Sequence, residues 1–199
     1  MKRGIDVSEH KGTINWQDVV NDGNEFAIIR LGWGNQHLDE RFYDNFNGAL
    51  NAGLKVGIYY YSEATDASEA AAEAEYALYV MQDAGITPDM LEMGFWFDEE
   101  NDDWKSDRLT DPEEITDICT TFISTMEVAG YHCGLYANYD YLTNVIDMGR
   151  LPGVPAWCAQ YNSQCDYDGA AIWQCTDSYF INGAQFDNCL LYTSDAADE

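Results

Sequence analysis

Short apolar runs alternate with helical patterns along most of the sequence, and this alternation limits the folds open to the chain. The runs that read as strands are rich in β-branched and aromatic residues and end in polar ones. They cover residues 4–8, 26–33, 55–62, 93–99 and 132–138. Strands separated by helices at this spacing are typical of a parallel sheet with right-handed crossovers.

The helical segments between these runs carry recognisable start and stop signals. In the clearest case Asp66 occupies the N-cap, Glu69 follows three residues later as in a capping box, and Gly85 marks the end. A second helix starts at Asp111, where the sequence Asp-Pro-Glu-Glu supplies a cap, a proline at the first helical position and acids in the first turn. A shorter helix ends at Gly53.

The alternation of strand and helix patterns ends near residue 150, where three apolar runs follow one another with only turn-like linkers between them. These runs, VPAWCAQY, GAAIWQCT and AQFDN, leave no room for intervening helices. We therefore expect an α/β fold, a modified TIM-like barrel of about five β/α units followed by about three strands without helices. A length of 199 residues suits one domain, and we assign residues 1–188 to it.

The tail CLLYTSDAADE, residues 189–199, resembles the translation of a transposon-type sequencing adapter. All eleven residues fit one codon choice for such an adapter without a gap. We predict that this tail is adapter read-through and not part of the native domain. Independent sequencing of the source locus tests the prediction, because recovery of the same tail without adapter would contradict it.

Charge and residue spacing exclude several classes of protein. The formal net charge is −27 and the nine basic residues are scattered, so the chain repels phosphate backbones and no nucleic-acid partner is expected. No stretch approaches the ~20 apolar residues of a membrane span, and the N-terminus lacks the apolar core of a signal peptide. The six cysteines contain no CxxC pair and the three histidines have no zinc-binding spacing, so we expect neither metal nor cofactor.

The stretch FWFDEEN places three carboxylates directly after an aromatic strand. In a chain with 36 acidic residues such a run is most often solvated surface, and Glu99 is expected to be an ordinary acid of this kind. Asp98 and Glu100, however, project to the same side of a strand, because residues i and i+2 share a face. Asp6 and Asp187 also lie at strand ends. Active sites of parallel barrels form at the C-terminal ends of the strands, so these four carboxylates are predicted to meet.

Aromatic and polar side chains are expected around the carboxylates. Tyr61, Trp157 and Tyr161 are candidates for contact with a carbohydrate, because an aromatic ring stacks on the apolar face of a pyranose. His10 either lines the cleft or serves as a structural hydrogen-bonding group. The complete expected substrate-binding set is Tyr59, Tyr61, Trp157, Gln160, Tyr161 and His10.

Four other large or charged side chains are expected to be structural. Trp16, Trp96 and Phe97 are expected to pack in the core or the barrel wall. Arg30 lies on an otherwise apolar strand, and we expect it to pair with inward-facing acids rather than to touch substrate.

A group of carboxylates ringed by aromatic residues is suited to the cleavage of glycosidic bonds. The reaction needs a protonated carboxyl group that donates to the leaving oxygen, and an ionised one that stabilises the positive charge at the sugar. Close packing of carboxylates raises the pKa of one of them, so that it retains its proton.

Seven motifs in order, GIDVSEHKGTINW, FAIIRLGWG, GLKVGIYYYS, FWFDEEN, AWCAQY, IWQCT and QFDN, together resemble glycoside hydrolase family 25, the Chalaropsis-type lysozymes of bacteria and phages. The resemblance covers residues 4–188. It implies a muramidase that hydrolyses the β-1,4 bond between N-acetylmuramic acid and N-acetylglucosamine in peptidoglycan. It also implies a barrel of five β/α units and three further strands, in agreement with the alternation described above.

Residue roles follow from the same resemblance. Glu100 would be the general acid, and Asp98 would stabilise the sugar cation directly or orient the substrate's own N-acetyl group. Asp6 and Asp187 would tune the protonation of that pair. The implied partner is the glycan strand of peptidoglycan, attacked by a monomer outside the cell at the bacterial wall, after secretion or phage release. The alternative is a barrel that binds glycan without cleaving it.

Overall fold

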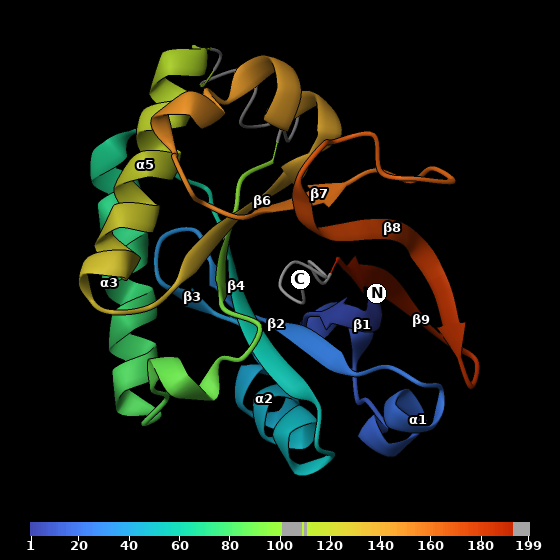
Figure 1. The fold of residues 1–199 in the computed structure, drawn as a ribbon. Helices are drawn as coiled ribbons and strands as arrows, with labels where there is room; N and C mark the ends of the chain where they lie inside the picture. Colours follow the sequence, from blue (N-terminus) through green and yellow to red (C-terminus); the bar gives the residue numbers. More distant parts are fainter. Residues whose placement is uncertain (101–108, 110, 193–199) are drawn as a thin grey trace, which may run out of the picture.

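The computed structural model describes residues 1–100, 109 and 111–192, and its strands form a closed barrel (Figure 1). In order around the barrel these strands are β1 (Lys2–Val7), β2 (Phe26–Trp33), β4 (Lys55–Tyr61), β5 (Phe95–Asp98), β6 (Cys133–Asn138), β7 (Ala156–Ala159), β8 (Ala170–Ile181) and β9 (Ala184–Leu191). Neighbours from β1 to β8 run parallel, whereas β9 is antiparallel to both β8 and β1. A short strand β3 (His37–Leu38) pairs with the end of β2.

Helices follow the first strands and lie outside the ring that they form (Figure 1). Within the described residues the α-helices are α1 (Trp16–Asn21), α2 (Phe42–Asn51), α3 (Ala67–Asp83) and α5 (Pro112–Val128), and the short helical turns are η1 (Glu9–Lys11), η2 (Pro88–Met90), η3 (Tyr141–Val145) and η4 (Met148–Arg150). After β6 only η3 and η4 occur in the described residues, and none separates β7, β8 and β9. The predicted modified TIM-like barrel is confirmed. No helix within the described ranges is long and apolar enough to cross a bilayer.

The helix signals in the sequence act as predicted for the two long helices. The side chain of Asp66 accepts a hydrogen bond from the backbone N–H of Glu69 at 2.9 Å, at the start of α3. Asp111 caps α5 in the same way through the N–H of Glu113 at 2.9 Å. The six-residue α1 was not predicted, because it spans fewer than two turns and shows no clear apolar period.

The barrel wall has an apolar layer on each side. Its outer side packs against the helices through residues such as Ile29 and Phe97. Its inner side holds a separate cluster of Phe26, Ile28, Met93, Trp96, Tyr136, Trp157, Ile172 and Cys189. Trp16, Trp96 and Phe97 are 9%, 4% and 0% exposed, which confirms that they belong to the packed interior.

Residues 189–191, part of the tail predicted to be adapter, lie in β9, where Cys189 is the register partner of Gly4. Residues 193–199 lie outside the described residues. The origin of the tail stays a prediction from its sequence.

Two glycines make room for the large rings inside the barrel. A Cβ atom at Gly4 would lie 2.4 Å from Cδ2 of Phe26, and one at Gly134 would lie 2.4 Å from Cζ3 of Trp96. Trp96 is held in place because its indole N–H donates to the carbonyl of Met93 at 2.7 Å. Aromatic rings can therefore fill the N-terminal half of the barrel and leave its C-terminal end to polar side chains.

We expect Gly134→Ala to lower the free energy of unfolding by about 1–3 kcal/mol, because the added methyl group overpacks a fixed indole ring. Urea unfolding of the variant and the wild type measures the difference. In a Trp96→Leu background the same substitution should cost less, since the indole ring is gone. Part of the cost should remain, because the added Cβ would still lie 2.9 Å from the carbonyl oxygen of Pro155. An equal cost in both backgrounds would contradict this account of Gly134.

Candidate active site

A pocket at the C-terminal ends of the barrel strands brings together nearly all the predicted site residues. Its lining consists of Asp6, Ser8, His10, Arg30, Tyr59, Tyr61, Asp98, Glu100, Tyr136, Trp157, Tyr161, Gln174 and Asp187. The four carboxylates singled out in the sequence all belong to this lining, and they come from β1, from β5 and its extension, and from β9.

The antiparallel pairing of β1 with β9 sets two of these carboxylates opposite each other. Asp6 and Asp187 are register partners across the two strands. Burial of Asp6, which is 5% exposed, and the charge of Asp187 together raise the pKa of Asp6 to about 7. Burial also raises the pKa of Asp187, but the ammonium of Lys11, 3.0 Å from its carboxylate, opposes that rise. Asp6 therefore retains its proton to higher pH than its partner.

A hydrogen-bond network joins Asp6 to two tyrosines through Gln174. The amide Nε2 of Gln174 donates to Oδ2 of Asp6 at 2.8 Å. Its Oε1 accepts from the hydroxyl groups of Tyr136 and Tyr161, at 3.0 and 3.1 Å. The sequence analysis missed Gln174 and Tyr136 as site residues, although Gln174 is two residues after the inward-facing Ile172 and so shares its face.

Asp98 and Glu100 line the pocket together, as the two-residue strand period predicted. Asp98 is the last residue of β5 and is buried, and Glu100 is half-buried. Glu99 points away from the pocket, but the expectation of a surface acid was wrong, because its side chain is fully buried. It shares a face with Phe97, which packs 4.3 Å from the ring of Phe122 in α5, and so it enters the layer between barrel and helices.

The aromatic residues of the pocket lie at different depths. Trp157 is only 1% exposed, and its ring makes edge contacts with Tyr59 and Tyr136 at centroid distances of 6.1 and 4.6 Å. Tyr161 is 58% exposed and Tyr61 is partly exposed. Tyr61 and Tyr161 thus offer ring surface to a ligand, whereas Trp157 forms the floor beneath it.

Gln160 is a predicted binding residue that does not line the pocket. Its Nε2 donates to the carboxylate of Asp166 at 2.9 Å, and its Oε1 accepts from the backbone N–H of Asp166 at 2.8 Å. Gln160 follows the last residue of β7, so strand alternation no longer fixes its direction. The amide that does reach the pocket is Gln174 on the neighbouring strand β8.

Arg30 pairs with acids, as expected, although not with the four carboxylates of the pocket. Its Nε donates to Asp39 at 2.8 Å, and its Nη2 lies 3.5 Å from the carboxylate of Glu9. Asp39 is 1% exposed and also accepts from the backbone N–H of Glu9 at 3.0 Å. These contacts hold η1, which carries His10 to the wall of the pocket.

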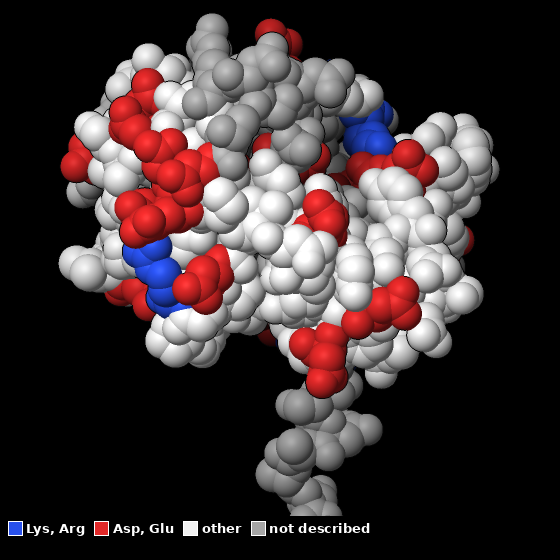
Figure 2. Space-filling model, turned by 90° about the horizontal axis from the view of Figure 1, so that it is seen from above, with Lys and Arg blue, Asp and Glu red and all other residues white. Residues whose placement is uncertain are grey.

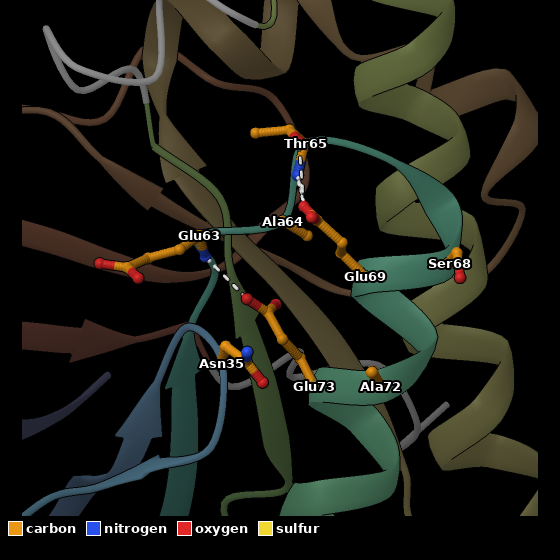
Figure 3. A pocket seen from close by; sticks show the side chains of 8 residues that line it. All are labelled: Asn35, Glu63, Ala64, Thr65, Ser68, Glu69, Ala72 and Glu73. Atoms are coloured by element: carbon orange, nitrogen blue, oxygen red, sulfur yellow. Dashed lines mark hydrogen bonds between the residues drawn. The ribbon is translucent and has the colours of Figure 1, made fainter.

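A second pocket lies between the loop after β4 and helix α3 (Figure 3). Its acids brace the loop, because Glu69 accepts from the backbone N–H of Thr65 at 2.8 Å and Glu73 from that of Glu63 at 2.9 Å. None of the predicted catalytic residues lines this pocket. Its carboxylates therefore hold in place the loop that follows Tyr61.

Comparison with known proteins identifies similar sequences. The sequence model of glycosyl hydrolases family 25 matches residues 5–184. Lysozyme M1 of Streptomyces globisporus is 40% identical over 74 residues, covering 37% of this chain and 25% of that protein. The autolytic lysozyme of Clostridium acetobutylicum is 35% identical over 74 residues, covering 37% of this chain and 22% of that protein. The matched stretch spans about a quarter of the length of each curated relative.

Solved structures are similar over almost the whole chain. The modular autolysin LytC of Streptococcus pneumoniae superposes with a TM-score of 0.85 at 25% identity, over 96% of this chain and 46% of that chain. LytC has the same agreement in its complex with a synthetic peptidoglycan ligand. A family 25 glycosyl hydrolase of Bacillus anthracis has a TM-score of 0.81 at 20% identity, over 98% of this chain and 90% of that chain, and so shares the fold.

The raised pKa of Asp6 predicts a pH-dependent effect of Asp6→Asn on stability. The folded protein binds the Asp6 proton more tightly than the unfolded chain, so the wild type loses stability as the pH rises from about 4 to about 7. An asparagine at this position does not ionise and carries no such penalty, so the variant should gain up to about 4 kcal/mol relative to wild type over that range. Urea unfolding at pH 4 and pH 8 measures the gain, and a pH-independent difference would contradict it.

Proposed function

Because the chain belongs to glycosyl hydrolases family 25, as its motifs predicted, we propose that it is a muramidase acting on peptidoglycan. The bond cleaved would be the β-1,4 linkage between N-acetylmuramic acid and N-acetylglucosamine. The observation that carries this proposal is the meeting of four carboxylates in one pocket whose rim offers tyrosine rings. Such a pocket combines a proton donor, an ionised stabiliser and a surface for a sugar ring.

In this proposal Glu100 is the general acid and Asp98 stabilises the reacting sugar. Both project from the end of β5 to the same side of the pocket, so the two groups can act on one glycosidic bond. Glu100 would protonate the leaving oxygen as the bond breaks. Asp98 would stabilise the positive charge directly or orient the N-acetyl group of the substrate as an internal nucleophile.

Asp6 and Asp187 would set the charge of the pocket during the reaction. Lys11 supports an ionised Asp187, whereas burial favours a neutral Asp6, so below the pKa of Asp6, about 7, the pair carries fewer than two negative charges. One charge fewer in the pocket reduces the repulsion that an ionised Asp98 experiences. Tyr59, Tyr61, Trp157, Tyr161 and His10 would shape the binding surface, and Gln160 would support the loop that carries Tyr161.

The substrate class is supported by the solved complex of LytC with a synthetic peptidoglycan ligand, a protein of the same fold. The glycan strand would lie across the pocket while the protein acts as a monomer outside the cell, at the bacterial wall. Secretion and phage release would both bring it there.

Glu100→Gln tests the assignment of the general acid. We expect the variant to lose at least about 100-fold in kcat, because general acid catalysis typically contributes at least this much and glutamine has no proton to donate. Purified peptidoglycan is digested, the new reducing ends are reduced with borohydride, and the products are identified by mass spectrometry. Wild-type protein should yield muramitol ends and the variant almost none.

Glu63→Gln is the matched control, because Glu63 follows a neighbouring strand and lines only the second pocket. It should retain wild-type activity. If neither wild type nor Glu100→Gln produces new ends while both still bind peptidoglycan, the muramidase proposal fails and a glycan-binding barrel replaces it. Glucosaminitol ends would indicate cleavage of the other glycosidic bond.

The net charge of −27 predicts a salt dependence of wall lysis. Acidic side chains are spread over the face seen in Figure 2, with few basic ones among them. Anionic wall polymers repel such a surface, and salt screens that repulsion within about 10 Å at 0.1 M. Lysis of whole cells should therefore increase from low to moderate salt, whereas cleavage of short uncharged glycan fragments should stay level. A flat or falling rate with whole cells would contradict the prediction.

A further inference from the structure

Both hydrogen bonds that Asp6 accepts reach the same oxygen. Oδ2 accepts from Nε2 of Gln174 at 2.8 Å and from the thiol of Cys189 at 3.2 Å. Within the described residues no hydrogen bond reaches Oδ1, although Asp6 lines the pocket. Cys189 belongs to the tail predicted to be adapter, so Gln174 is the donor on which the position of the proton depends. With the N–H of Gln174 directed at Oδ2, a proton taken up by this carboxyl group belongs on Oδ1, the oxygen left to the pocket.

Two tyrosines fix the orientation of the Gln174 amide. The hydroxyl groups of Tyr136 and Tyr161 both donate to Oε1, and Gln174 is 4% exposed. Burial raises the pKa of both phenols, so both remain protonated donors across the neutral range. A reversed amide would set its oxygen against Oδ2 of Asp6, which is unfavourable when Asp6 is ionised, and would require both tyrosine hydroxyls to act as acceptors instead of donors. The tyrosines therefore fix the amide, and the amide fixes Asp6.

We propose that Gln174 is a positioning residue that directs the proton of Asp6 toward the substrate. With Oδ2 committed to the amide, neutral Asp6 donates a hydrogen bond from Oδ1 to an acceptor oxygen of the sugar, either a hydroxyl or an acetamido carbonyl. Through Oε1 the same amide holds Tyr161 at the rim of the pocket. The choice of a sugar as acceptor rests on the proposed function, whereas the network itself does not.

The electrostatic surroundings of Asp6 favour its neutral form. The titratable and charged groups that share the pocket region with it are Asp187 and Cys189 on β9, His10 and Lys11 on η1, Arg30 on β2, Tyr59 on β4, Asp98 on β5, Glu100 after it, Tyr136 on β6 and Tyr161 after β7. Burial and Asp187 raise the pKa of Asp6, and Gln174, Cys189 and Lys11 lower it, with a net value of about 7. Asp6 can therefore donate at neutral and mildly acidic pH.

Gln174→Met tests the proposal, because methionine keeps the length of the side chain and removes both its donor and its acceptor. Carbon NMR of the aspartate carboxyl groups follows the titration of Asp6 directly. We expect the pKa of Asp6 to rise, since the amide N–H stabilises the ionised form. With soluble peptidoglycan fragments, the alkaline limb of kcat/KM should move to higher pH by no more than that amount, because Glu100 must also be protonated, while kcat falls about tenfold through lost positioning.

Tyr161→Phe is the matched control, because it removes one donor to Oε1 and leaves the bond from Gln174 to Asp6. This variant should raise KM and leave the alkaline limb in place. Circular dichroism and thermal unfolding establish that each variant is folded. If Gln174→Met does not fold, Gln174→Glu retains the acceptor for both tyrosines and should also raise the pKa of Asp6, through its charge.

Two outcomes would overturn the proposal. One is an unchanged titration of Asp6 in folded Gln174→Met, and the other is a loss of activity without any movement of the alkaline limb, which would leave Gln174 a purely structural role. A shifted titration in a protein that cleaves no glycan would be a different result. It would refute the muramidase proposal and leave the positioning of Asp6 by Gln174 established.

Discussion

Two carboxylates, Asp6 and Asp187, lie opposite each other where β9 closes the barrel against β1, and the rest of the site depends on this contact. Like charges directly opposite in an antiparallel ladder repel. Here the repulsion is relieved unequally, because Lys11 pairs with Asp187 while burial leaves the proton on Asp6. Barrel closure therefore produces a pair whose members differ in protonation, beside the carboxylates at the end of β5.

The second constraint is the two-residue period of the strands, which divides each strand between the barrel interior and the helical layer. It sends Asp98 and Glu100 into the pocket and Glu99 into the layer beside Phe97. It also places Gln174 inside, in phase with Ile172. A shift of one residue in the pairing of β5 or β8 would bury the wrong side chains on both faces at once, so the packing of the wall also specifies the site.

The alternation of strands and helices was sufficient to predict the barrel, and strand period with strand ends was sufficient to bring Asp6, Asp98 and Glu100 to one pocket. Asp187 also lines that pocket, but it lies within the antiparallel β9 and not at a strand end as predicted. The failures have separate physical causes. Glu99 is buried by tertiary packing that no local pattern reveals, and Gln160 lies just beyond the end of β7, where alternation stops. Gln174 was missed because a neutral amide on an apolar strand has no local feature that indicates a site. Its role depends on its partners Tyr136 and Asp6, which lie 38 and 168 residues away along the chain.

The closure of the barrel by β9 also concerns the order of events during folding. Asp6 contacts Gln174 across 168 residues and Cys189 across 183, so these bonds close loops that span most of the chain. Contacts of such separation carry a large entropic cost and form after local ones have reduced the search. During synthesis, the parallel strands and their helices can assemble while Asp6 still faces water as an ordinary ionised acid. In this order of events, Asp6 and Asp187 acquire their final surroundings only when β9 docks against β1.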